Sequence, residues 1–213
     1  MAVHSNNHPS AARVLLGLAL ALLAGSCGHR QTAERSILPA DVVLRPGDVV
    51  LRRGSGLTSR AVLAAEGGGQ YSHVGIVADS CGTLVVVHAV PGETQREGEP
   101  ECVKADRPAQ FFSSVRASCG SVWRHPDAVK AQRAALQALN YHARRLLFDH
   151  DYDDLDTTRL YCSELVEHAY NAVGVTLVGS RRHNFALPAA TYRHLILPSD
   201  FTKGHRLRHV RSF

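Results

Sequence analysis

The sequence lacks the cysteine and histidine spacings that mark a metal-binding protein. Its 213 residues include five cysteines, but no Cys-x-x-Cys pair and no His/Cys pattern of the kind that holds zinc. Internal repeats and low-complexity tracts are also missing. With 45% hydrophobic and 20% charged residues, the chain has the composition of one globular domain. We expect no metal and no cofactor.

The N-terminal apolar run is too short to span a bilayer. From Val14 to Ala24 it has about eleven residues, whereas a transmembrane helix needs about 20. Arg13 precedes it and small residues follow, an order typical of a secretory signal. Its ending, LLAGSC, resembles a bacterial lipobox, with Ala24 where leucine is commonest. We predict a signal peptide over 1–26, a lipidated Cys27 with a tether to residue 40, and a domain over 41–213. An ordinary cleaved signal is the alternative.

Export changes how the other cysteines are interpreted, because exported compartments are often oxidising. If Cys162 stays reduced, at most one disulfide can form among Cys81, Cys102 and Cys119. A bond between Cys102 and Cys119 would flank a loop-like region, but the sequence leaves the pairing open.

Positive charge is in excess, with a formal net charge of +5 and a basic C-terminal stretch, KGHRLRHVRSF. An exported lipoprotein does not meet nucleic acid, so we expect none as a partner. The basic stretch suits anionic lipid or cell-wall polymer, or is simply the solvated side of a final strand. Gly28, rather than aspartate, follows Cys27, which favours the outer membrane, on its periplasmic side, in a Gram-negative source. We expect a monomer.

Local patterns predict several short elements. DVVLRPGDVVLRRG gives two strand-like runs around a Pro-Gly turn, and a helix starts at Leu57, capped by Thr58 or Ser59. Residues 91–108 read as a variable polar loop, and residues 127–148 as a long alanine- and leucine-rich helix. The acidic run DHDYDDLDTT does not complete a calcium loop, because an aspartate replaces the loop glycine and a leucine the closing glutamate.

A helix beginning at Cys162 carries the first candidate for catalysis. In RLYCSELVEHAY and the residues after it, Cys162, Leu165, Val166, Ala169 and Val173 share one face, and the neighbouring polar residues lie elsewhere. The N–H groups and positive dipole of a helix start lower the pKa of a thiol there. A cysteine on an apolar helix face is also common in protein cores, so a nucleophile additionally needs a base.

A β-hairpin over YSHVGIVADSCGTLVVVHAV supplies the base. Tyr71 and His73 share one strand face, and His88 lies on a face of the second strand. If the connection has an even number of residues, such as the four from Asp79 to Gly82, His73 lies directly opposite His88. The pair is then a base with an orienting partner. Tyr71 points either into the cleft or into the core.

The ordered motifs GDVVLRRG, YSHVGIV and YCSELV resemble the YiiX/YaeF-like permuted papain family, of the NlpC-type cysteine hydrolases. The resemblance covers residues 44–174. It implies an α+β fold, with an antiparallel sheet packed on the nucleophile helix, and a histidine hairpin that precedes the cysteine. Cys162 would be the nucleophile and His73 the general base. His88 occupies a third position that is commonly glutamate, although lecithin-retinol-acyltransferase-like members use histidine there.

Two functions follow from this resemblance. The first is an exported, lipid-anchored cysteine hydrolase that acts on an amide or related acyl bond of the cell envelope, in a peptidoglycan peptide or an N-acyl lipid. An acyltransferase with the same thioester intermediate is a variant of it. The second is a catalytically silent lipoprotein that binds envelope polymer. The presence of both Cys162 and His73 favours the enzyme.

Overall fold

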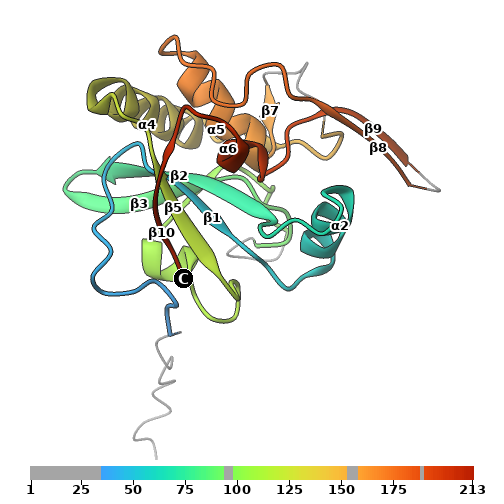
Figure 1. Ribbon diagram of the computed structural model, residues 1–213, viewed down its shortest axis with the longest axis horizontal. Helices are drawn as coiled ribbons and strands as arrows, with labels where there is room; N and C mark the ends of the chain where they lie inside the picture. Colours follow the sequence, from blue (N-terminus) through green and yellow to red (C-terminus); the bar gives the residue numbers. More distant parts are fainter. Residues whose placement is uncertain (1–34, 94–97, 153–157, 188–189) are drawn as a thin grey trace, which may run out of the picture. The chain divides into compact units, whose positions relative to one another are not determined.

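A six-stranded antiparallel sheet forms the centre of the protein (Figure 1). The structure is a computed structural model that describes residues 35–93, 98–152, 158–187 and 190–213. The strand order is β10-β5-β1-β2-β3-β4. The strands are β1 (Val49–Arg52), β2 (His73–Ser80), β3 (Thr83–His88), β4 (Lys104–Asp106), β5 (Gly120–Arg124) and β10 (Arg208–Ser212).

Helices and two small strand pairs surround this sheet. The helices are α2 (Leu57–Ala65), α3 (Pro108–Phe111), α4 (Ala128–Ala143), α5 (Cys162–Asn171) and α6 (Asp200–Lys203). Strands β6 (Leu147–Phe148) and β7 (Arg159–Leu160) pair in parallel, and β8 (His183–Leu187) and β9 (Ala190–Leu195) form an antiparallel hairpin. Within the described ranges, every helix is too short or too polar to cross a membrane. This mixed α and β architecture with a large antiparallel sheet agrees with the predicted class.

Each face of the sheet has its own core, because side chains alternate along a strand. Helices α4 and α5 lie side by side on one face (Figure 1), over residues such as Val74 and Ile76. The opposite face holds Val77 and Val86, which pack with Phe111 and Phe112 around α3. Odd-numbered residues at the start of β2, including His73, therefore lie on the sheet face that packs against α3.

Small residues let α4 lie close to the sheet. Its buried face consists of Ala131, Ala134, Ala135 and Ala138. A Cβ atom built on Gly47, which has a φ of +89°, would lie 2.5 Å from atoms of Ala131. The helix begins after Asp127, whose carboxylate accepts the N–H groups of residues 129 and 130.

The hairpin of β2 and β3 closes through a two-residue turn. Ser80 pairs with Thr83, and the turn residues Cys81 and Gly82 have φ angles of 53° and 81°. Two successive positive φ angles are typical of a type I′ turn, whose twist matches that of the strands. The predicted four-residue connection was therefore wrong. Continuing the observed register places His88 opposite Gly75, two residues from the predicted partner His73.

Helix α5 is buried around almost its whole circumference. Its polar residues Ser163, Glu164 and Glu167 are all 0% exposed, so the prediction that they lie away from the packed side was wrong. Both carboxylates bind backbone N–H groups. Glu164 accepts from Tyr161 at the helix start, and Glu167 accepts from Leu177 and Val178 in the following loop. These bonds fix the position of the first turn, where Cys162 lies.

Several predicted boundaries differ from the structure. Residues 41–44 form no strand, and α2 begins after Gly56 rather than at a threonine or serine cap. Helix α4 ends at Ala143 because Arg145 takes a φ of 54°. The predicted loop over 91–108 contains strand β4. The predicted signal peptide and Cys27 lie outside the described residues.

The described cysteines form no disulfide, and the basic C-terminal stretch is exposed. Cys81, Cys102, Cys119 and Cys162 are all free thiols. Strand β10 is exposed along its whole length at the edge of the sheet, which agrees with the interpretation of the basic stretch as a solvated final strand.

Candidate active site

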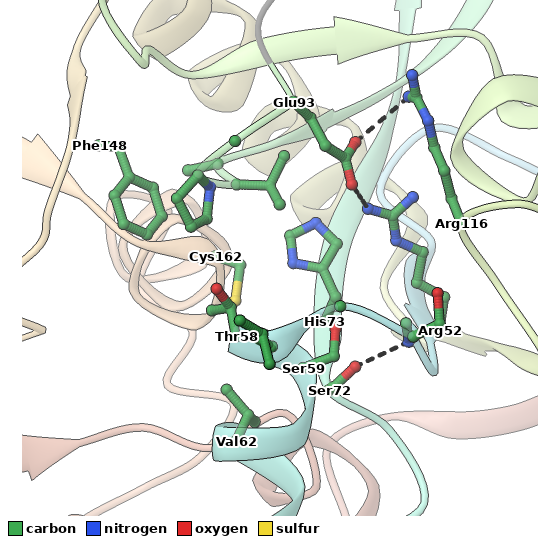
Figure 2. A pocket seen from close by; sticks show the side chains of 18 of the residues that line it. Arg52, Thr58, Ser59, Val62, Ser72, His73, Glu93, Arg116, Phe148 and Cys162 are labelled. Atoms are coloured by element: carbon green, nitrogen blue, oxygen red, sulfur yellow. Dashed lines mark hydrogen bonds and ion pairs between the residues drawn. The ribbon is translucent and has the colours of Figure 1, made fainter.

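Cys162 lies in a pocket of about 420 Å³ at the start of α5. His73, the first residue of β2, lines the same pocket, and Figure 2 shows a ring nitrogen of His73 turned toward the sulfur of Cys162. Helix α2 and Phe148 contribute uncharged residues to its lining, among them Thr58, Ser59 and Val62, and another part of the lining is charged. The charged wall is formed by Arg52, Glu93 and Arg116 (Figure 2). The structure thus brings together the predicted nucleophile and the predicted base.

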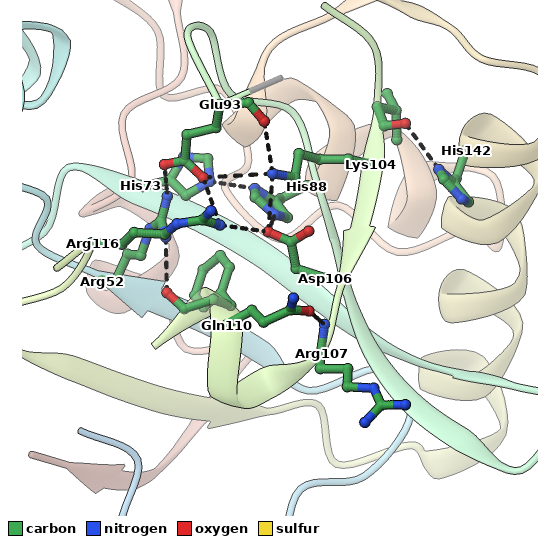
Figure 3. Close-up of polar contacts among 12 residues, drawn as sticks. Arg52, His73, His88, Glu93, Lys104, Asp106, Arg107, Gln110, Arg116 and His142 are labelled. Atoms are coloured by element: carbon green, nitrogen blue, oxygen red, sulfur yellow. Dashed lines mark hydrogen bonds and ion pairs between the residues drawn. The ribbon is translucent and has the colours of Figure 1, made fainter. Parts of the chain in front are cut away.

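A chain of hydrogen bonds leads from His73 into the protein. Nε2 of His73 lies 2.8 Å from Nδ1 of His88, and Nε2 of His88 lies 3.2 Å from Oδ2 of Asp106 (Figure 3). Both imidazoles pack against the ring of Phe111, at centroid distances of 5.6 and 5.1 Å. The two histidines share a sheet face, as predicted, because the register error of two residues conserves the face.

The chain determines which nitrogen of each imidazole carries the proton. An ionised Asp106 only accepts hydrogen bonds, so Nε2 of His88 donates to it. Nδ1 of a neutral His88 is then an acceptor, and Nε2 of His73 must donate to it. Nδ1 of His73 is left with a lone pair on the side of Cys162. This tautomer is the one that a general base for the thiol requires.

An ion-pair network surrounds the two histidines. Oδ2 of Asp106 lies 3.1 Å from Nζ of Lys104 and 3.1 Å from Nη1 of Arg116. Glu93 binds Arg52 at 2.5 Å and Arg116 at 3.3 Å (Figure 3). Nη1 of the buried Arg52 also donates to the carbonyl oxygen of Phe111. Three cations thus face two carboxylates, which leaves one positive charge in excess beside the imidazoles.

Burial and this excess charge keep both histidines neutral. Burial is the main reason that the pKa of His73 lies well below its ordinary value, and Arg52 adds to the effect. Burial likewise lowers the pKa of His88 to about 4, although the hydrogen bond to Asp106 acts in the opposite direction. Burial alone would raise the pKa of Asp106, but His88 and Lys104 lower it overall, so Asp106 is ionised. An ionised Asp106 and a neutral His88 are the charge states from which the tautomers of the two histidines follow.

The prediction of a lowered pKa for the Cys162 thiol was wrong. Burial raises its pKa above the ordinary thiol value. Backbone N–H groups of Val74, Ser163 and Cys162 itself act in the predicted direction, but burial outweighs them. The hydroxyl of Ser163 lies 3.9 Å from the sulfur. The resting site therefore holds a thiol beside a neutral imidazole rather than a thiolate beside an imidazolium.

Tyr71 does not line the pocket. It is 5% exposed and packs in the core on the helix face of the sheet, which is the second of the two placements considered for it. Asp106 and Glu93 were not predicted as site residues. Both lie in the segment expected to be a variable loop, and nothing in its local pattern indicates that it folds over His88.

Asp149 and Asp151, from the acidic run, are neighbours in the structure. An oxygen of Asp149 accepts the backbone N–H of Asp151, and Arg159 pairs with Asp151 at 3.0 Å. The third aspartate of the alternating pattern, Asp153, lies outside the described residues.

The fold and the site together define a mixed α/β protein in which a helix-start cysteine meets a His–His–Asp chain on an antiparallel sheet. Among solved structures, this fold resembles the crystal structure of the metalloprotein YiiX from Escherichia coli O157:H7. The two align with a TM-score of 0.63 and 18% sequence identity, over 79% of this chain and 97% of YiiX. The YiiX resemblance inferred from the sequence is confirmed for the fold. No protein-family model matches the chain, and no curated protein does.

Proposed function

We propose that the protein is a cysteine hydrolase that cleaves an amide or related acyl bond through a thioester on Cys162, on a permuted papain-like scaffold of the NlpC type. One observation carries this proposal. The hydrogen-bond chain from Asp106 through His88 leaves the basic nitrogen of His73 in the pocket that contains the Cys162 thiol. A purely structural pair of buried histidines has no need of this tautomer or of a shared pocket with a thiol.

The first half-reaction forms the acyl-enzyme. The sulfur of Cys162 attacks the carbonyl carbon of the substrate while Nδ1 of His73 takes the thiol proton. The carbonyl oxygen becomes an oxyanion, which N–H groups in the first turn of α5 stabilise, that of Cys162 among them. The intermediate collapses when His73 returns the proton to the leaving amine or alcohol. A thioester remains on Cys162.

The second half-reaction releases the acid. His73 takes a proton from water, which attacks the thioester, and then returns the proton to the departing sulfur. His73 is an imidazolium between the two proton transfers, and His88 stabilises it through the hydrogen bond that ends on Asp106. An amine or alcohol in place of water makes the same protein an acyltransferase.

The donor set of the site does not suit a metal ion, although the structural neighbour YiiX is called a metalloprotein. Both nitrogens of His88 are used in the chain, and the carboxylate of Asp106 is bound by Lys104 and Arg116 as well. Across the described ranges, no group of three or more His, Cys, Asp or Glu side chains is placed to hold a metal. We therefore derive no step through a metal ion.

The cellular setting is part of the proposal. We take the protein to be exported and anchored by lipid on Cys27, on the basis of the sequence pattern over residues 13–27. Its substrates then belong to the cell envelope. Intact-mass analysis of the mature protein tests this point, because an unmodified N-terminus at another residue contradicts it.

The direct test of the chemistry is the detection of a covalent acyl-enzyme on Cys162. The purified protein is incubated with p-nitrophenyl acetate, and the mass of each cysteine-containing peptide is measured. We expect one acetyl group on Cys162, which is lost with time and reforms on further addition. His73→Ala should slow both steps by about 10²- to 10⁴-fold, the usual contribution of a general base.

The controls separate reactivity from folding. Cys162→Ser nearly conserves volume and should abolish turnover with an unchanged melting temperature, whereas Cys81→Ser, at an exposed turn, should leave turnover unchanged. Acetylation spread over several cysteines without turnover would favour the silent binding lipoprotein. A Cys162→Ser variant with normal turnover would overturn the assignment of Cys162 as the nucleophile.

A further inference from the structure

An apolar groove continues from the thiol pocket between α2 and the β8–β9 hairpin. Its volume is about 330 Å³. From α2 it is lined by Leu57, Thr58, Ala61, Val62 and Ala65, and from the other side by Tyr152, Phe185, Tyr192, Leu195 and Leu197. The polar groups among these side chains are one threonine hydroxyl and two tyrosine hydroxyls. A surface of this composition suits a hydrocarbon chain, because it offers few hydrogen-bond partners to a peptide backbone or a sugar.

The groove and the thiol pocket form one continuous site. Leu57, Thr58, Val62 and Tyr152 line both. Tyr152 lines the thiol pocket together with Cys162. On the groove side its ring contacts Tyr192 at a centroid distance of 5.6 Å. Tyr152 therefore lies at the junction of the two cavities.

The thiol lies between surfaces of opposite character. Figure 2 shows Thr58 and Val62 on one side of Cys162, and Glu93 and Arg116 beyond His73 on the other. An acyl bond centred on the sulfur then has its apolar part on the side of α2. Its polar leaving group lies along the charged wall. The site is built for an amphiphilic substrate with a hydrocarbon acyl chain.

We propose that the groove between α2 and the β8–β9 hairpin binds the acyl chain of the substrate, so that the natural substrates are N-acyl or O-acyl lipids rather than peptidoglycan peptides. This inference rests on the proposed thioester chemistry, because the chain must be attached to the carbonyl that Cys162 attacks. Leu57, which is 83% exposed, lines both cavities, so an acyl chain from solvent can reach the site there.

Chain length is the first measurement. The full-length protein is assayed with p-nitrophenyl esters from acetyl to dodecanoyl, each below its aggregation concentration. Each buried methylene contributes about 0.8 kcal/mol, so kcat/KM should rise about fourfold per methylene until the groove is full. Dodecanoyl esters that react no faster than acetyl esters overturn the groove assignment, and they leave the thioester chemistry standing if acetyl transfer to Cys162 is seen.

Groove-filling variants provide the second measurement. Ala61 and Ala65 line the groove but not the thiol pocket, so Ala61→Phe and Ala65→Phe should flatten the chain-length dependence of kcat/KM. Ala64→Phe, at an exposed position of the same helix outside the groove, is the matched control and should retain the dependence. An equal effect of Ala64→Phe would mean that bulk on α2, not groove occupancy, explains the result.

A binding experiment keeps the two proposals distinct. Cys162→Ser is titrated with dansyl-undecanoate, whose fluorescence reports transfer into an apolar site without any reaction. We expect saturable binding of the fluorescent acid. Ala61→Phe should abolish this binding, and added acetate should not compete with it. Binding without hydrolysis of any ester would retain the groove and overturn the hydrolase. Absence of saturable binding overturns the groove.

Discussion

At the scale of the residue, the site depends on the position of protons rather than on a reactive thiolate. Burial raises the pKa of Cys162 and lowers that of His73, so both partners are uncharged at rest. In the proposed reaction, the thiol proton moves to His73 only during the attack, and the resulting imidazolium needs stabilisation at that moment only. The carboxylate of Asp106, two hydrogen bonds away, supplies it without making His73 a permanent cation.

Asp106→Asn should therefore impair catalysis strongly. An amide can donate to Nε2 of His88, which moves the proton of His88 to Nδ1 and, in turn, that of His73 to the nitrogen beside the thiol. By comparison with the aspartate of serine protease triads, we expect kcat to fall ~100-fold or more, with KM little changed. Asp79→Asn, at the far end of the same hairpin, is the control and should have normal kcat.

Alkylation gives an independent measure of the Cys162 thiol. Iodoacetamide reacts with thiolates, so a thiol with a raised pKa reacts slowly at neutral pH. We expect Cys162 to be modified more slowly than the exposed Cys81 at pH 7, with a rate that rises through pH 9. Peptide mass spectrometry over a pH series measures both rates. A Cys162 that is the fastest cysteine at neutral pH would contradict the neutral resting pair.

At the scale of the element, the β2–β3 hairpin positions His88 by close backbone approach. A Cβ atom on Gly75 would lie 2.6 Å from Cγ1 of Val86, 3.1 Å from the carbonyl oxygen of Val87 and 3.2 Å from Cβ of His88. Val86 is itself fully buried and packs with Phe111 of α3. The absence of a side chain at Gly75 therefore allows His88 to lie close enough to bond to His73.

Gly75→Ala should displace His88 and loosen the hairpin. Overpacking of a tight core costs about 1–3 kcal/mol of unfolding free energy, and we expect a loss in this range. Turnover should fall together with stability, because the bond between the two imidazoles is broken. Urea unfolding measures the first effect and ester hydrolysis the second. Gly56→Ala, where an added Cβ meets nothing within 4 Å, should cost far less stability.

The hairpin also shows how far the sequence predicts the structure. Period-two alternation placed His73 and His88 on one face, and helical periodicity placed Cys162 at a helix start, because both signals are local. The turn was mispredicted because a type I′ turn usually begins with asparagine, aspartate or glycine, and here it begins with Cys81. Asp106 was missed because its contact with His88 depends on the pairing of β4 with β3, and no local pattern encodes that pairing.

At the scale of the whole molecule, the buried polar cluster links stability to pH. Arg52, Lys104, Arg116, Glu93 and Asp106 surround two histidines that are neutral in the folded state. Each histidine regains its ordinary pKa of about 6.5 on unfolding. As the pH falls, the stability of the folded protein therefore decreases before any carboxylate of the cluster is protonated. The reason is that burial raises the free energy of a charged His88 more than Asp106 lowers it.

The unfolding free energy should fall as the pH decreases from 6.5 to about 4, the pKa of folded His88. In this window the unfolded chain binds a proton at His88 that the folded protein does not, so stability decreases by up to about 1.4 kcal/mol per pH unit for this residue. Urea unfolding at a series of pH values measures the slope.

His88→Gln removes this proton and should flatten the curve relative to the native protein, whatever its absolute stability. His205→Gln, at an exposed position, controls for the loss of a histidine and should follow the native curve. Parallel curves for the native protein and His88→Gln would mean that His88 has the same pKa in the folded and unfolded chain, which would contradict the lowering of its pKa by burial.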